Sequence, residues 1–112
     1  MSETSELSNT PANIAGEIDI LKDLLTRKQQ NYGESVFQPP FLAPDLSVYD
    51  GIMTRLSDKF SRLHTLNSGV PDVVNESVED TIRDIAGYCI LTLVELKRER
   101  QEREQTAKKT TA

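Results

Sequence analysis

The sequence predicts an all-α protein, a small bundle of three main helices with a long C-terminal helix. Three segments carry apolar residues at spacings of three and four, the repeat of a helix with one buried face. No segment alternates apolar and polar residues as a half-buried strand does. Residues 34–48, with three prolines, form a Pro-rich connection between the first and second helices.

The first helix is predicted over residues 13–30, after a polar segment, residues 1–12, that we expect to be disordered. Asn13 is placed to cap its start, and Gly33 to take the left-handed conformation beyond its end. Its inward positions are Ile14, Ile18, Leu21 and Leu25. The connection that follows should pack across the helices, because it holds the apolar residues Phe37, Phe41, Leu42 and Leu46.

The second helix is predicted to start near Ser47 and to run to about Leu66. Ser47, followed three residues later by Asp50, resembles a capping box. The segment Asn67-Ser68-Gly69 should end this helix. Its inward stripe consists of Ile52, Leu56, Phe60 and Leu63.

The third helix is predicted from about Asn75 to Glu104, with residues 106–112 as a disordered tail and residues 13–105 as one helical domain. A helix of this length extends about 45 Å, more than a domain of this size covers. We expect a homo-oligomer, dimer or higher, and a frayed, exposed helix end is the alternative explanation. We call its predicted inward positions the aliphatic stripe: Val78, Ile82, Ile85, Cys89, Leu93 and Leu96.

Composition excludes several classes of function. The net charge of −5 argues against general nucleic-acid binding but leaves a small nucleotide ligand open. No apolar run reaches the ~18 residues of a membrane span, and the N-terminus lacks the pattern of a secretory signal. The single cysteine, Cys89, rules out an intramolecular disulfide and is expected in the core. We therefore expect a cytoplasmic protein, in the host cytoplasm if it is phage-encoded.

Three carboxylates, which we call the acidic stripe, follow one side of the third helix at intervals of four residues: Glu76, Asp80 and Asp84. Like charges at this spacing disfavour a helix, so something should offset their repulsion. The helix N-terminus or salt bridges to a neighbouring helix would do so structurally, and Mg²⁺ would do so functionally. Tyr88 extends the series. Gly87 lies on the same side as Glu76 and Asp80, where it would let a backbone or a ligand approach.

Basic and aromatic side chains are candidates to bind a phosphate and a base. Lys59 and Arg62 share one face of the second helix and could pair with the acidic stripe or hold a phosphate. Lys28 and Tyr32 stand at the end of the first helix, where Tyr32 is an ordinary helix-end residue or offers its ring to a base. The sequence shows no hydrolytic triad, phosphate-binding glycine motif or zinc-ligand spacing.

Three elements of the chain resemble the small helical phage and bacterial family named nucleotide-modification-associated domain, type 1. They are Lys-x-x-(Asp/Asn)-Tyr-Gly at 28–33, Asp-Lys-Phe-x-Arg-Leu at 58–63, and Glu-Ser-x-x-Asp-Thr-x-x-Asp-x-Ala-x-Tyr at 76–88. The resemblance covers roughly residues 25–95. It implies an all-helical protein linked to phage nucleotide or DNA-base modification. The chain departs from the pattern at Asn31, where Asp is expected, and this weakens the case for a cation there.

The acids are also similar to those of the all-helical nucleoside triphosphate pyrophosphohydrolases, which hold Mg²⁺ with Glu-x-x-Glu and Glu-x-x-Asp pairs. Glu76 and Glu79 supply one such pair. Glu17, Asp19 and Asp23 of the first helix are wrongly spaced to supply a second. This departure counts against a direct pyrophosphohydrolase assignment, and the sequence leaves open whether the protein is an enzyme.

Two hypotheses follow. The first is a phage-type nucleotide-binding protein that takes part in nucleotide or DNA-base modification or sequesters a nucleotide, with Mg²⁺ on the acidic stripe as the expected cofactor. Its ligand would contact the basic and aromatic side chains Lys28, Tyr32, Lys59, Arg62 and Tyr88. The alternative is a non-catalytic helical interaction or scaffold protein that acts through oligomerisation or a protein partner. In that case the acidic and basic elements pair with each other.

Overall fold

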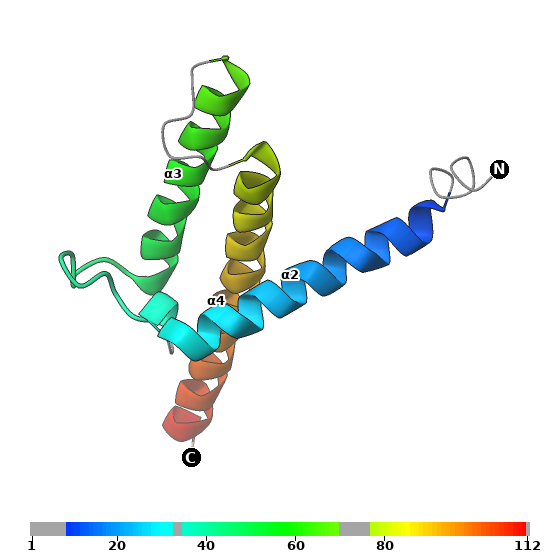
Figure 1. The fold of residues 1–112 in the computed structure, drawn as a ribbon. Coiled ribbons are helices and arrows are strands. Elements are labelled where there is room, and N and C mark those ends of the chain that lie inside the picture. The colour runs from blue at the N-terminus through cyan, green and yellow to red at the C-terminus, as the bar shows by residue number, and fades with distance from the viewer. Residues whose placement is uncertain (1–8, 33–34, 70–76, 112) are drawn as a thin grey trace. The chain divides into compact units, whose positions relative to one another are not determined.

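The computed structural model describes residues 9–32, 35–69 and 77–111, but not the side chains of residues 28–32, 110 and 111. Helix α2 spans Thr10–Tyr32, α3 spans Val48–Asn67 and α4 spans Val78–Thr111, with a short 3-10 helix, η1, at Ser35–Phe37 (Figure 1). These ranges contain no strand. The predicted all-α fold with a long C-terminal helix is therefore confirmed.

Contacts divide the chain into two compact units, residues 1–33 and 34–112. The packing of α2 into a three-helix bundle, and the treatment of residues 13–105 as one domain, stay predictions. In the first unit α2 begins at Thr10, earlier than the predicted cap, and the N–H of Asn13 donates to the carbonyl of Asn9 at 3.2 Å. Asn13 is thus inside the helix, and its assignment as the cap is wrong.

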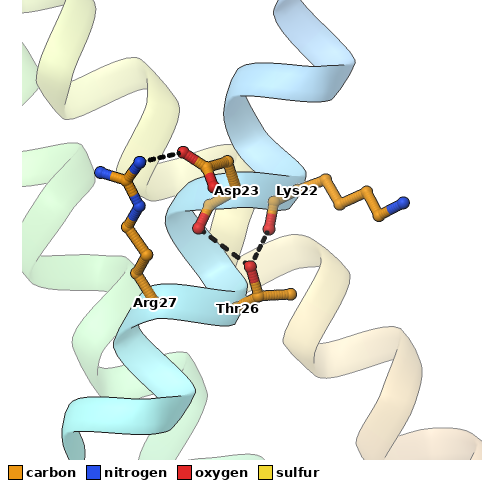
Figure 2. A network of polar contacts seen from close by, with 4 residues as sticks. All are labelled: Lys22, Asp23, Thr26 and Arg27. Carbon is orange, nitrogen blue, oxygen red and sulfur yellow. Dashed lines mark hydrogen bonds and ion pairs between the residues drawn. The ribbon is translucent and has the colours of Figure 1, made fainter.

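Contacts within one turn support α2 along its length (Figure 2). Asp23 and Arg27 form an ion pair of 2.8 Å, and the Thr26 hydroxyl donates to the carbonyls of Lys22 and Asp23 at 3.0 Å each. Both charged side chains are largely exposed, so the pair stabilises the helix by only a few tenths of a kcal/mol. The helix therefore keeps exposed apolar residues that local contacts do not cover, namely Ile14, Ile18 and Ile20.

In the second unit α3 and α4 lie side by side and run in opposite directions (Figure 1). The Ser47 hydroxyl oxygen accepts from the N–H of Asp50 at 3.0 Å and caps α3, as predicted. Gly69, with φ of 83°, follows the Ser68 cap at the other end, which confirms the predicted stop. Each of these boundaries depends on residues within one turn of it.

Helix α4 begins and ends later than predicted. The Ser77 hydroxyl oxygen accepts from the N–H of Asp80 at 3.0 Å and so caps a helix that starts at Val78. The helix continues to Thr111, through the segment 106–112 that we expected to be disordered. The strong helix formers and alternating charges of residues 97–105 lead into this segment and favour continuation of the helix.

The described part of the proline-rich connection packs against both helices through Pro40 and Phe37 and exposes other apolar residues. A Cβ added to Gly51 of α3 would lie 3.1 Å from Cγ of Pro40, so only glycine allows the connection to approach this closely. The guanidinium carbon of Arg98 on α4 lies 4.8 Å from the centre of the Phe37 ring. Phe41 and Leu42 are exposed and do not contribute to the packing that we expected of them.

Helix α4 buries its polar side rather than its aliphatic stripe. Ile82 and Leu93 are 49% and 63% exposed, and Cys89, predicted to be in the core, is exposed as well. Thr81 and Glu95 are buried in their place. Since residues repeat every 100° around a helix, the buried side is centred about 120° from the aliphatic stripe. The prediction of the inward face of α4 is therefore wrong.

The apolar core of the described residues is correspondingly small. Ile52 on α3 is the one large hydrophobic side chain that is buried there, while Leu56 and Leu63 are half-buried and Phe60 is exposed. The predicted inward stripe of α3 is thus correct except at Phe60. Within the described ranges, no helix combines the length and the apolar character needed to cross a membrane.

The close contact at Gly51 generates a stability prediction. Replacing Gly51 with Leu should lower the free energy of unfolding by about 1–3 kcal/mol, because the new side chain meets Pro40 and forces the connection away. Urea denaturation followed by circular dichroism measures this change. Gly16→Leu is the matched control: a Cβ there meets nothing within 4 Å, so stability should hold or rise. Equal effects of the two substitutions would contradict the assigned packing.

Candidate functional site

An ion pair between Lys59 on α3 and Asp84 on α4 joins the two helices. Nζ of Lys59 lies 2.9 Å from Oδ2 of Asp84, and the side chains are only 26% and 17% exposed. Removing two charges from most of their water costs about as much free energy as their attraction returns. The pair therefore contributes more to fixing the position of α3 against α4 than to the stability of the fold.

The antiparallel arrangement places further polar side chains beside this pair. Both helices rise 1.5 Å per residue, so a step from Lys59 toward Arg62 on α3 matches a step from Asp84 toward Thr81 on α4. In the other direction Arg55 comes level with Tyr88. All of these side chains are buried or half-buried. A band of hydroxyl, carboxylate and cationic groups thus runs along the contact between α3 and α4.

The structure brings together two of the predicted site residues, Lys59 and Asp84, and two others, Arg62 and Tyr88, lie half-buried on the paired helices about one turn to either side. Of the two roles open to Lys59, pairing with the acidic stripe is the one observed. Three other predicted residues cannot be placed: the side chains of Lys28 and Tyr32, and Glu76, lie outside the described residues.

Asp80 does not join the band. Its carboxylate is 62% exposed and lies 3.8 Å from the guanidinium of Arg83, one turn along the same helix. Gly87, one residue before Tyr88, is buried. Its lack of a side chain therefore serves close packing, as a glycine in a helix commonly does.

The described carboxylates do not form a metal site by themselves. Asp84 is paired with an ammonium group, and Asp80 faces solvent beside a guanidinium group. Within the parts of the chain that the structure describes, no three His, Cys, Asp or Glu side chains gather closely enough to hold a metal ion. Since Glu76 lies outside those parts, Mg²⁺ binding by Glu76, Asp80 and Asp84 stays a prediction.

Glu95 is a polar residue of this face that the sequence reasoning missed. Its side chain is only 7% exposed. Burial raises the pKa of its carboxyl group, Glu99 and Glu102 raise it further, and Arg98 opposes them. Glu95 is seven residues after Tyr88, two helical turns along the same side. That spacing was the available signal, although Glu95 itself lies between Val94 and Leu96, just before the charged run that begins at Lys97.

The raised pKa of Glu95 predicts a stability that falls as pH rises. From the ordinary glutamate pKa up to the folded-state pKa, the folded protein holds more protons than the unfolded chain, so the free energy of unfolding decreases with pH. Glu95→Gln removes this penalty. The variant should be more stable than the parent at pH 7, and the difference should vanish below about pH 4.

Urea denaturation of both proteins at pH 4 and pH 7 measures the difference. The exposed Glu104 of the same helix provides the control, since Glu104→Gln should change stability little at either pH. A Glu95→Gln variant that is less stable than the parent at pH 7 would show that the carboxylate is held by favourable contacts instead.

Comparison with known proteins identifies the family. The family described as nucleotide modification associated domain 1 matches residues 28–96, which is more than half of the chain. No curated protein and no solved structure matches the sequence. The matched segment contains both partners of the ion pair and the side chains beside it. The chain belongs to the nucleotide modification associated domain 1 family, as its resemblance to that family had indicated.

Proposed function

We propose that the protein binds a nucleotide on the polar band between α3 and α4. It would be a phage-type protein that takes part in nucleotide or DNA-base modification or sequesters a nucleotide. The observation that carries the proposal is the Lys59–Asp84 pair, placed inside the segment that matches the family. A helix that buries carboxylate and hydroxyl groups while exposing aliphatic ones departs from the usual pattern, and such departures concentrate at functional sites.

The band has the groups that a nucleotide requires. Lys59 and Arg62 are cations for a phosphate, and the planar guanidinium of Arg62 is suited to paired phosphate oxygens. Asp84 accepts hydrogen bonds from a sugar or a base, and Tyr88 offers a ring or a hydroxyl group. In the free protein Asp84 holds the ammonium group of Lys59 in position. A phosphate would replace one anionic partner of Lys59 with another, and Asp84 would then require a different cation, such as Mg²⁺.

Mg²⁺ would enter with the ligand. Mg²⁺ typically takes one or two carboxylates from the protein and further oxygens from phosphates, so a protein site with few free carboxylates is no obstacle. Glu76 and Asp80 are the carboxylates that we propose for this role, alongside Asp84. The proposal concerns binding and assigns no reaction.

Isothermal titration calorimetry tests the proposal. The protein is titrated with ribonucleoside and deoxyribonucleoside mono- and triphosphates, with and without Mg²⁺. We expect at least one to bind. Asp84→Asn, which keeps the side-chain volume, and Lys59→Met should each weaken that binding by about tenfold or more. Asp23→Asn breaks an exposed ion pair on α2 and should leave binding unchanged.

Two results would contradict the proposal. One is the absence of binding by every nucleotide at millimolar concentration. The other is retention of full affinity by both Asp84→Asn and Lys59→Met. Melting temperatures measured in parallel separate lost binding from lost structure. If Asp84 has a purely structural role, Asp84→Asn should lower the melting temperature of a protein that binds no nucleotide.

A second candidate function has its own support. The exposed aliphatic stripe of α4 favours a non-catalytic interaction protein that acts through oligomerisation or a protein partner. In that case Lys59 and Asp84 serve only to hold α3 against α4. The two functions are compatible, because the aliphatic stripe and the polar band lie on different sides of α4.

A further inference from the structure

We propose that two copies of the chain associate through the aliphatic stripe of α4, with their helices antiparallel and Cys89 at the twofold axis. This inference concerns a different side of α4 from the proposed nucleotide site and does not depend on it. Its evidence is the exposure of the stripe, the order of residues within it and the charges beside it.

The exposure of the stripe indicates that another apolar surface packs against it. Ile82, Leu93 and Leu96 are each more than two-fifths exposed, and Cys89 is exposed between them. From Ile82 to Leu96 the stripe extends about 21 Å along the helix. Since Ile52 is the one large hydrophobic side chain buried in the described part of the chain, the unit formed by α3 and α4 has little apolar core of its own. Burying this stripe would add the apolar contact that this unit lacks.

Five of the six residues in the stripe, all except Val78, are spaced symmetrically about Cys89. The positions Ile82, Ile85, Cys89, Leu93 and Leu96 are spaced by three, four, four and three residues. Reversing the helix direction about Cys89 therefore places Ile82 against Leu96 of the second copy and Ile85 against its Leu93. A twofold interface requires such self-complementarity, whereas an unrelated partner does not. The symmetry thus favours a second copy of this chain as the occupant.

The charges beside the stripe select the antiparallel direction. Glu79 and Lys97 are exposed and 18 residues apart, which is five turns, so they lie on the same flank of the stripe. In the antiparallel pair Glu79 of each copy lies close to Lys97 of the other, which gives two pairs of opposite charge. In a parallel twofold pair the same flank of the two helices lies on opposite sides of the interface, so Glu79 and Lys97 would not form pairs of opposite charge.

Cysteine cross-linking tests the geometry. Mild oxidation of the parent protein should give a disulfide-linked dimer, since Cys89 is the single cysteine and lies at the proposed axis. In a Cys89→Ser background, Glu79→Cys and Lys97→Cys should cross-link when the two proteins are mixed. Alone, each should remain uncross-linked, because the two like positions lie about 30 Å and 24 Å apart along the paired helices.

Cross-linking of each variant with itself, but not of the mixture, would overturn the antiparallel arrangement. No cross-linking of any of them, the parent included, would overturn the interface. A short bis-maleimide reagent serves as a second readout where the disulfide angle at Cys89 is unsuitable.

Sedimentation velocity tests the association itself. The parent should be a dimer at micromolar concentrations, and Leu93→Glu should raise the dissociation constant by about tenfold or more. Leu42→Glu is the matched control, since Leu42 is 92% exposed in the connection and lies outside the stripe. Circular dichroism shows whether each variant folds. A monomeric parent, or equal effects of the two substitutions, would overturn the proposal.

Charge reversal provides a variant that keeps the apolar residues. Glu79→Lys and Lys97→Glu should each weaken the dimer, and the double variant should restore it, because the opposite charges are then exchanged across the axis. Both residues are exposed, so neither change should unfold the chain. Additive weakening in the double variant would overturn the antiparallel pairing.

Discussion

The contact between Lys59 and Asp84 determines how α4 is turned about its own axis. A charge largely removed from water must be paired, and Asp84 on the inner side of α4 meets its partner on α3. This orientation brings Thr81 and Glu95 inside with it. It also leaves the aliphatic stripe outside, since the two sides are about 120° apart. The small core, the polar band and the exposed stripe are thus consequences of one orientation.

The sequence predicted what depends on neighbouring residues. The fold class, the cap at Ser47 and the stop at Gly69 follow from local chemistry, and the structure agrees with each. The orientation of α4 could not be predicted in this way. Periodicity shows which residues share a side of a helix, and hydrophobicity is the usual guide to which side is buried. In α4 that guide fails, so the aliphatic stripe, Cys89 included, was assigned to the wrong side.

The candidate site was predicted in part for the same reason. Lys59, Arg62, Asp84 and Tyr88 were selected from their charge, spacing and motif, and the structure pairs Lys59 with Asp84 and leaves Arg62 and Tyr88 half-buried on the same two helices. Glu95 was missed because it lies on a different side of the helix from the aliphatic stripe, the side that hydrophobicity assigns to solvent. Its raised pKa is a property of tertiary burial. Local spacing could suggest Glu95 only once Asp84 was known to face inward.

The orientation of α4 reduces the apolar surface that the pair of helices α3 and α4 buries, and association of two copies would recover it. A chain that buries a carboxylate such as Glu95 and exposes Leu93 loses apolar burial that a helix hairpin would ordinarily gain. Association through the aliphatic stripe would recover that burial without covering the Lys59–Asp84 pair, because the two lie on different sides of the helix. The second copy would then leave the polar band of the first uncovered. The second copy would supply the apolar contact, so the inner side of α4 would not have to be apolar.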